Sequence, residues 1–235
     1  MSHSRNLLSL ILILFSFAGY AQKEKVKYLP YVDQRRVHFG FMLGMHTQDL
    51  VFTQNGYTTD DGENWFAEVP NFSPGFAVGL MGDLAFTESL NLRFTPSMYF
   101  GSKTVKFREH NSKERVTQDV KSNYLALPVG LRYSSQRINN YRPYIMTGIS
   151  PMIDLSKRKD TPILLKRFDA CIEIGLGCDI YLPYFKLIPE LKFSFGLLDL
   201  LEKNRKDLKD PTMIKYTQSL DKAKSRMVVL SFYFE

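Results

Sequence analysis

The sequence predicts an all-β fold, an eight-stranded antiparallel transmembrane β-barrel with short periplasmic turns and long outer loops. Three observations predict it. Eight segments alternate apolar residues with small or polar ones, which is the period of a β-strand. The connections between these segments alternate roughly between long and short, as in outer-membrane barrels. The N-terminus has the pattern of an export signal, so the mature chain leaves the cytoplasm.

The export signal is residues 1–21. Arg5 precedes an apolar run over residues 7–17, and small residues lie before a cleavage site between Ala21 and Gln22. A membrane-spanning helix needs about 20 apolar residues, so this run is too short for an anchor. Because lipid cannot satisfy unpaired backbone groups, an exported chain without such a helix inserts only as closed strands.

The mature chain divides into a polar N-terminal tail, residues 22–37, and a barrel domain, residues 38–235. We expect the protein in the bacterial outer membrane, with both termini in the periplasm. The net charge of +7 is spread along the chain. In an exported protein this charge favours outer-membrane lipid and acidic protein surfaces as partners, and it disfavours nucleic acid.

The first three predicted strands share one pattern. The first, residues 38–46, alternates large apolar side chains with glycines. A long polar loop, residues 47–74, separates it from the second strand, residues 75–84, and a tight turn leads to the third, residues 90–100. In each strand the apolar positions form one face, which we assign to lipid, while small and charged positions face inward.

The remaining strands are less uniform. The polar segment 101–122 still alternates and extends strands three and four beyond the membrane; strand four itself is residues 123–133. Strand five, residues 143–153, has apolar residues on both faces, so its facing stays open. The last long loop, residues 197–224, begins with leucines that could form one face of an amphipathic helix. The eighth strand is residues 225–235.

Strands six and seven form a β-hairpin over residues 168–196, and each is long enough to cross a bilayer. Pro183 cannot adopt the positive φ of a two-residue primed turn. We therefore expect a four-residue turn over residues 182–185, which pairs Tyr181 with Lys186.

This register also predicts ion pairs inside the barrel. It places Gly175 opposite Lys192, so that Glu173 and Lys192 become diagonal neighbours on the inner face. Asp179 and Lys186 become diagonal neighbours in the same way. We expect at least one of these two pairs to be a close ion pair.

Two mid-strand prolines argue against a regular ladder of hydrogen bonds in the predicted barrel. Pro96 belongs to strand three and Pro189 to strand seven. A proline removes one hydrogen bond from the ladder, and a closed barrel has no edge on which to place it. We therefore expect a local β-bulge at each proline.

Charged residues of both signs lie on the inward face of the predicted strands. An eight-stranded barrel has an interior just wide enough to be filled with side chains. Charges in that interior need partners to offset their desolvation, so we predict a structural charge cluster rather than a catalytic pair. Its members are Asp83, Arg93, Arg132, Glu173, Asp179, Lys186, Glu190 and Lys192.

No motif predicts a cofactor, a metal ion or a small-molecule substrate. Gly175 and Gly177 lack the helix and acidic partner of a dinucleotide site, and residues 60–64 lack the spaced ligands of a calcium loop. Cys171 and Cys178 lie on opposite faces of one strand, too far apart for a disulfide. We interpret both cysteines as small apolar side chains that fill space in the packing of the strand.

The sequence also shows no catalytic constellation. Ser97 and Ser194 lie on inner faces, and His38 and His46 flank the first strand. Nothing in their spacing brings a nucleophile to its base. We therefore predict no catalytic residues and no enzymatic activity.

The mature chain resembles the PorT family of outer-membrane β-barrel proteins of type IX secretion, which includes the gliding-associated SprT proteins. The residues that carry this resemblance are VHFGFMLGMH at 37–46, NYLALPVGLRYSSQRINNYRPYIMTGIS at 123–150 and DACIEIGLGCDIYLPYFKLIPELKFSFGLLDLL at 169–201. The resemblance implies a non-enzymatic part of a protein-export machine, with other outer-membrane or periplasmic secretion-machine proteins as partners. The alternatives are a general structural or adhesin-like small barrel and a lipid-modifying outer-membrane enzyme.

Overall fold

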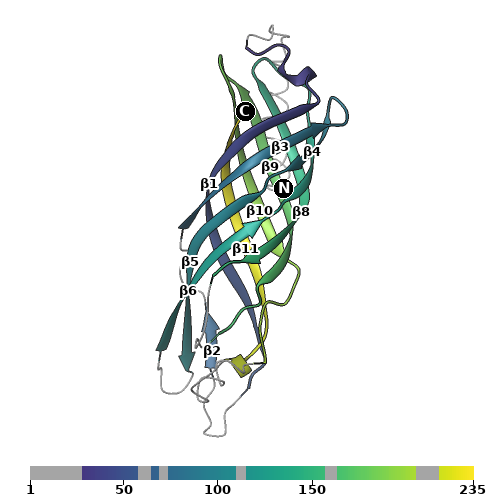
Figure 1. Cartoon of the computed structure of the whole chain (residues 1–235). Helices are drawn as coiled ribbons and strands as arrows, with labels where there is room; N and C mark the ends of the chain where they lie inside the picture. Colours follow the sequence, from purple (N-terminus) through teal and green to yellow (C-terminus); the bar gives the residue numbers. More distant parts are fainter. Residues whose placement is uncertain (1–27, 58–64, 69–73, 110–114, 157–162, 205–216) are drawn as a thin grey trace, which may run out of the picture.

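The computed structural model describes residues 28–57, 65–68, 74–109, 115–156, 163–204 and 217–235, and these form one antiparallel sheet that closes into a tilted barrel (Figure 1). The predicted signal peptide and its cleavage site at Ala21 and Gln22 lie outside the described residues. The strands are β1 Val37–Gln54, β2 Trp65–Glu68, β3 Pro74–Ala85, β4 Leu90–Phe94, β5 Ser97–Glu109, β6 Arg115–Ala126, β7 Val129–Ser134, β8 Tyr141–Asp154, β9 Phe168–Tyr181, β10 Lys186–Gly196 and β11 Leu220–Phe234.

The ring contains eight strands, as predicted. β4 and β5 are two parts of one strand interrupted at Pro96, and β6 and β7 are two parts of the next, interrupted at Pro128. Each of these eight strands pairs with its sequence neighbours, and β1 pairs with β11 to close the ring. The short β2, which the sequence pattern missed, pairs with β5 outside the ring. Among the described residues, no helix is long and apolar enough to cross a membrane.

The barrel has two different ends. Three short connections, residues 86–89, 135–140 and 182–185, lie at one end together with the start of β1 and the end of β11; we call this the short-turn end (upper end in Figure 1). The connections after β1, β5, β8 and β10 lie at the opposite end, which we call the long-loop end. This arrangement follows directly from antiparallel pairing of neighbouring strands.

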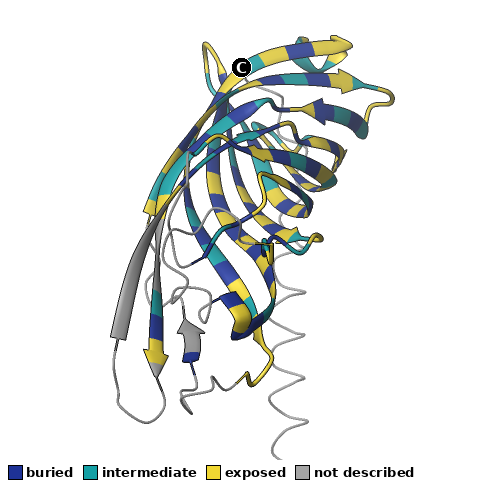
Figure 2. Cartoon of the chain, turned by 60° about the horizontal axis from the view of Figure 1, so that its bottom comes forward, coloured by how far each residue is buried: buried dark blue, intermediate teal, exposed yellow. Residues whose placement is uncertain are grey.

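The outer face of the barrel carries an apolar belt. Figure 2 shows the alternation of buried and exposed residues along the strands. On β1 the exposed side chains are Val37, Phe39, Phe41, Leu43 and Met45, while the side chains between them are turned inward. The belt on this strand therefore spans about the nine residues that a tilted strand needs to cross a bilayer. Strand five, whose facing the sequence left open, exposes Ile145, Ile149 and Ile153 and buries Tyr144, Met146 and Met152.

Beyond the belt, at the long-loop end, the pattern of β1 reverses. Asp49 now points outward and forms an ion pair with Arg226 of β11 at 2.6 Å. Leu50 points inward and is buried in an apolar cluster. We call this cluster the apolar plug, and it consists of Leu50, Trp65, Phe107, Ile163, Leu165, Leu200, Leu201, Leu220 and Ala223.

The structure corrects the predicted helix in the last loop. Residues 197–204 are not helical, because their backbone groups pair with other segments. The Leu200 N–H donates to the Ala223 carbonyl, and the Leu200 carbonyl accepts from the Lys166 N–H. Asp199 Oδ1 accepts the N–H groups of Leu201 and Ala223, which fixes the turn. Two of the leucines thus enter the apolar plug rather than one face of a helix.

The predicted bulges are also wrong. Around Pro96 the pairing of β3 runs from Phe94 to Ser97 without a change of register, so two residue pairs of the ladder are lost and no residue is inserted. The same holds on β10, where Pro189 keeps its place opposite Phe232 of β11. The prolines lie where ladder bonds are interrupted, and the neighbouring rungs hold the register across the gap.

Candidate functional site

The barrel interior holds a network of buried ion pairs, and Arg93 lies at the centre of this network. Arg93 Nη2 is 2.9 Å from Asp83 Oδ2, and Arg93 Nη1 is 3.2 Å from Glu190 Oε2. The hydroxyls of Tyr144 and Tyr233 donate to the two oxygens of Glu190 at 2.7 and 2.9 Å. Five strands, β3, β4, β8, β10 and β11, therefore meet around the Arg93 guanidinium and the Glu190 carboxylate, and the charges of both are compensated.

Arg132 extends this network toward the short-turn end. Its guanidinium forms a close ion pair with Asp179 and lies 3.5 Å from the same Asp83 carboxylate. It also stacks over the ring of Tyr144, with 4.0 Å between the guanidinium carbon and the ring centroid. The amide of Asn91 donates to Asp83 at 2.6 Å. Asp83 thus accepts hydrogen bonds from three side chains.

The hairpin register is confirmed, and it supplies a second ion pair. Tyr181 pairs with Lys186, and the N–H of Leu182 donates to the Phe185 carbonyl across the four-residue turn. Lys192 Nζ lies 3.1 Å from Glu173 Oε2, which is the predicted diagonal pair. The other predicted pair, Asp179 with Lys186, is replaced by pairs with different partners.

Lys186 pairs with Glu235 instead of Asp179. Glu235 follows the last strand, and His38 Nδ1 lies 2.5 Å from its Oε1. Burial alone would raise the pKa of the Glu235 carboxyl, but the hydrogen bond with His38 and the Lys186 ammonium together lower it. The end of the chain is thereby tied to both β1 and β10.

Each of the eight charged residues predicted for the interior is buried and has an ion-pair partner within the described structure. The space beside Arg132 and Asp179 is a cavity of about 20 Å³, which is room for about one water molecule. The apolar plug covers the network from the long-loop end.

The four residues considered as nucleophiles or bases have structural hydrogen bonds. The Ser97 hydroxyl donates to the Thr95 carbonyl, and the Ser194 hydroxyl donates to Glu173 at 3.3 Å. His38 contacts Glu235, as described above, and His46 Nε2 lies 3.2 Å from the Phe76 carbonyl oxygen. In these hydrogen bonds the two serine hydroxyls donate to a carbonyl and a carboxylate, and neither donates to a histidine. In the part of the chain that the structure describes, no three His, Cys, Asp or Glu side chains are grouped as metal ligands.

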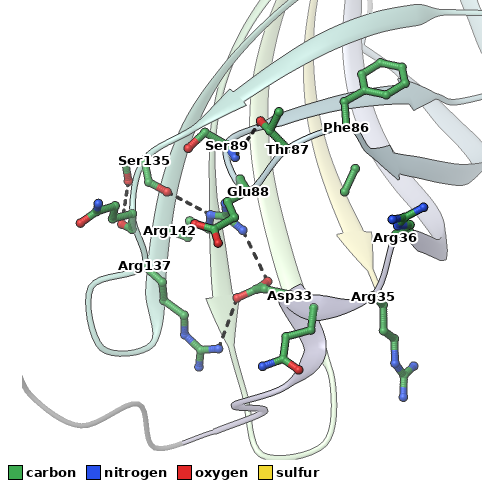
Figure 3. Close-up of a pocket in the computed structure, with 13 residues that line it drawn as sticks. Asp33, Arg35, Arg36, Phe86, Thr87, Glu88, Ser89, Ser135, Arg137 and Arg142 are labelled. Carbon is green, nitrogen blue, oxygen red and sulfur yellow. Dashed lines mark hydrogen bonds and ion pairs between the residues drawn. The ribbon is translucent and has the colours of Figure 1, made fainter.

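The N-terminal tail, whose position could not be predicted from its sequence, docks across the short-turn end. Asp33 lies in the 3₁₀-helix η2, Val32–Gln34, and its carboxylate accepts from the Tyr181 hydroxyl at 2.7 Å. Arg142 and Arg137 lie 3.5 and 3.6 Å from the same carboxylate (Figure 3). The tail has no periodic pattern of apolar residues, so Asp33, which stands close to two arginines in the sequence, is the one signal that marks this contact.

A pocket of about 500 Å³ lies beside the docked tail, between η2 and the two turns that follow β3 and β7 (Figure 3). Arg35 and Arg36 project from the tail along its rim. Both side chains are exposed, and neither has an ion-pair partner among the described residues. This end of the barrel therefore presents free positive charge on a surface outside the sheet.

The closed ring, the apolar belt and the ion-paired interior define a small integral β-barrel protein of the outer-membrane class. A family model described as "Outer membrane protein beta-barrel domain" matches residues 20–202, and the chain belongs to this family. No curated protein sequence matches the chain significantly.

Two solved structures are similar in fold. The outer membrane protein OprG from Pseudomonas aeruginosa aligns with a TM-score of 0.45 at 11% identity, over 83% of this chain and 93% of that chain. The outer membrane protein AlkL, solved in DMPC lipid bilayers, aligns with a TM-score of 0.41 at 11% identity, over 91% and 94%.

Proposed function

We propose that this outer-membrane barrel is a non-enzymatic component of the type IX protein secretion machinery, where it acts in assembly or cargo translocation by binding partner proteins. The secretion role rests on the resemblance of three stretches of the chain to the PorT family, and it extends to gliding motility in bacteria that glide. The filled interior is the observation that supports binding, and not transport through the barrel, as the mode of action. A barrel closed by ion pairs and an apolar plug has no lumen for a folded cargo, so it works through its ends and outer surface.

The partners we expect are other outer-membrane or periplasmic proteins of the same machine. We propose that both termini, and with them the short-turn end, face the periplasm. The exposed Arg35 and Arg36 there suit acidic protein surfaces, because opposite charges steer association. The long-loop end faces outward.

The test is secretion in a strain that lacks the gene, together with purification of the native complex. We expect cargo to accumulate in the periplasm, and we expect machine components to co-purify with the tagged full-length protein. Complementation with Ser97→Ala or Ser194→Ala should restore secretion, since neither hydroxyl serves chemistry on this account. Normal secretion in the deletion strain would contradict the proposal and favour a general structural barrel. Loss of secretion in a serine variant whose barrel is still folded would favour an enzyme.

A further inference from the structure

A second pocket, of about 590 Å³, lies at the short-turn end beside the seam where the first and last strands meet. The tail forms one wall, the start of β1 forms another, and the β9–β10 turn forms the third. The pocket shares only Arg35 with the one shown in Figure 3. Its lining side chains are Leu29, Pro30, Tyr31, Val32, Arg35, Val37, His38, Phe39, Tyr184, Phe185 and Glu235.

Large aromatic side chains surround this pocket and face away from the barrel. Tyr31 is 72% exposed, Phe39 is 74% exposed and Tyr184 is 94% exposed. Val37 and Phe39 also belong to the apolar belt on β1, so the pocket opens at the margin of the membrane. Amphipathic aromatic rings gather at this level because one side meets acyl chains and the other meets water.

Among the charged side chains that line the pocket, the one without an ion-pair partner in the described part of the chain is basic. Arg35 lines it with an exposed guanidinium that has no carboxylate partner among the described residues. The carboxylate that lines it, Glu235, is already paired with His38 and Lys186. An anionic group is therefore the ligand that the polar part of the pocket fits.

The wall made by the tail is held in a conformation that an L-residue seldom adopts. Leu29 has φ +46°, in the left-handed region, which costs free energy for a residue with a side chain. Arg137 holds it there: its guanidinium donates to the carbonyls of Tyr28 and Leu29 and lies 3.4 Å from the centroid of the Tyr181 ring. The wall is thus built by specific contacts rather than left by a loose tail.

We propose that this pocket binds an anionic phospholipid of the leaflet at the short-turn end. Arg35 contacts the phosphate, and Val37, Phe39 and Phe185 contact the adjoining acyl chain. A lipid fits better than a protein segment because the apolar walls are continuous with the belt that acyl chains already cover. This inference does not depend on the secretion role, since it concerns only the barrel and its membrane.

The test is native mass spectrometry of the full-length protein released from nanodiscs that contain phosphatidylglycerol and phosphatidylcholine. We expect the wild type to retain one phosphatidylglycerol in preference to phosphatidylcholine. Arg35→Ala should lower the affinity about tenfold, as expected for the loss of one hydrogen bond to a charged group. Arg36→Ala is the matched control, because Arg36 is a neighbouring exposed arginine outside this pocket, and it should retain the lipid.

A second variant, Tyr184→Ala, tests the apolar wall without a risk to folding, because its side chain is almost fully exposed. It should also weaken retention of phosphatidylglycerol. Equal losses in Arg35→Ala and Arg36→Ala would overturn the proposal, and so would equal retention of the two lipids by the wild type. Displacement of the lipid by inorganic phosphate would show a free-phosphate site instead. Unchanged lipid retention in Arg35→Ala, with loss of a co-purifying protein, would assign the pocket to a protein partner.

Discussion

At the scale of single residues, the stability of the barrel depends on buried charges that compensate one another. Arg93 is 1% exposed and joins Asp83 of β3 to Glu190 of β10 across the interior. Removal of that guanidinium leaves the Glu190 carboxylate without its ion-pair partner and bonded only to the neutral hydroxyls of Tyr144 and Tyr233. Breaking a buried pair in this way costs about 3–5 kcal/mol, because the remaining charge is left without a partner.

We therefore predict that Arg93→Met lowers the free energy of unfolding by about 3–5 kcal/mol. The measurement is urea-induced unfolding in lipid vesicles, followed by the mobility of unheated samples on SDS gels. Arg226→Met is the control, because Arg226 is half exposed and its pair with Asp49 lies on the outer surface. That change should cost no more than about 1 kcal/mol. Similar losses in both variants would show that the interior network has no special role.

The residues of the candidate site also show how much of the site could be predicted from the sequence. The period-two pattern assigned all eight charged residues to the interior, and the geometry of the turn gave the pairing of Glu173 with Lys192. Partners that come from non-adjacent strands could not be derived in this way. Asp179 of β9 pairs with Arg132 of β7, which is not a neighbouring strand. Lys186 pairs with Glu235 because the two residues lie opposite each other where β10 meets the end of the chain after β11.

At the scale of elements, a strand changes its binary pattern where it leaves the membrane. The predicted first strand ended at residue 46, which is the end of the apolar belt, whereas β1 continues to Gln54. In the extension Leu50 and Phe52 point inward to the apolar plug and Asp49 points outward, so neither face keeps the character that it has in the membrane. A search for one constant apolar face cannot follow a strand across that boundary.

A matched pair of cysteine variants tests this boundary. Leu43 and Val51 lie on the same outer face of β1, and each is 47% exposed. In a background with Cys171→Ala and Cys178→Ala, a membrane-impermeant maleimide should label Val51→Cys and leave Leu43→Cys unlabelled in intact vesicles. The reason is that lipid covers only the belt. Labelling of both positions would contradict the assignment of the belt, and protection of both would place the extension inside the membrane.

The apolar plug is a further feature at the scale of elements, and it contains a tryptophan whose fluorescence can be measured. Trp65 is the only tryptophan of the chain and is 3% exposed within the plug. We predict blue-shifted fluorescence that iodide quenches weakly.

Leu201→Lys, at a position 1% exposed in the plug, should shift the emission of Trp65 to longer wavelength and increase quenching. Leu197→Lys provides the control, because this leucine lies in the same loop and is 51% exposed. An unchanged spectrum in Leu201→Lys would show that the plug does not enclose Trp65.

At the scale of the whole molecule, the fold class and strand number followed from periodicity and loop lengths, because a barrel must repeat one pattern to close. The docked tail and the plug did not follow. Both depend on contacts between segments far apart in the chain, such as Asp33 with Tyr181 and Leu165 with Leu201. These contacts decide what the two ends of the barrel can do, and the function depends on them.

The central proposal is that the barrel, with its interior filled, acts by binding partners and not by passing solutes. Electrical recording of the purified protein in planar lipid bilayers tests it most directly. The ion-pair network and the apolar plug predict no stepwise conductance increments, although insertion is verified by the mobility of unheated protein on gels. Discrete, reproducible channel openings in the wild type would contradict the account.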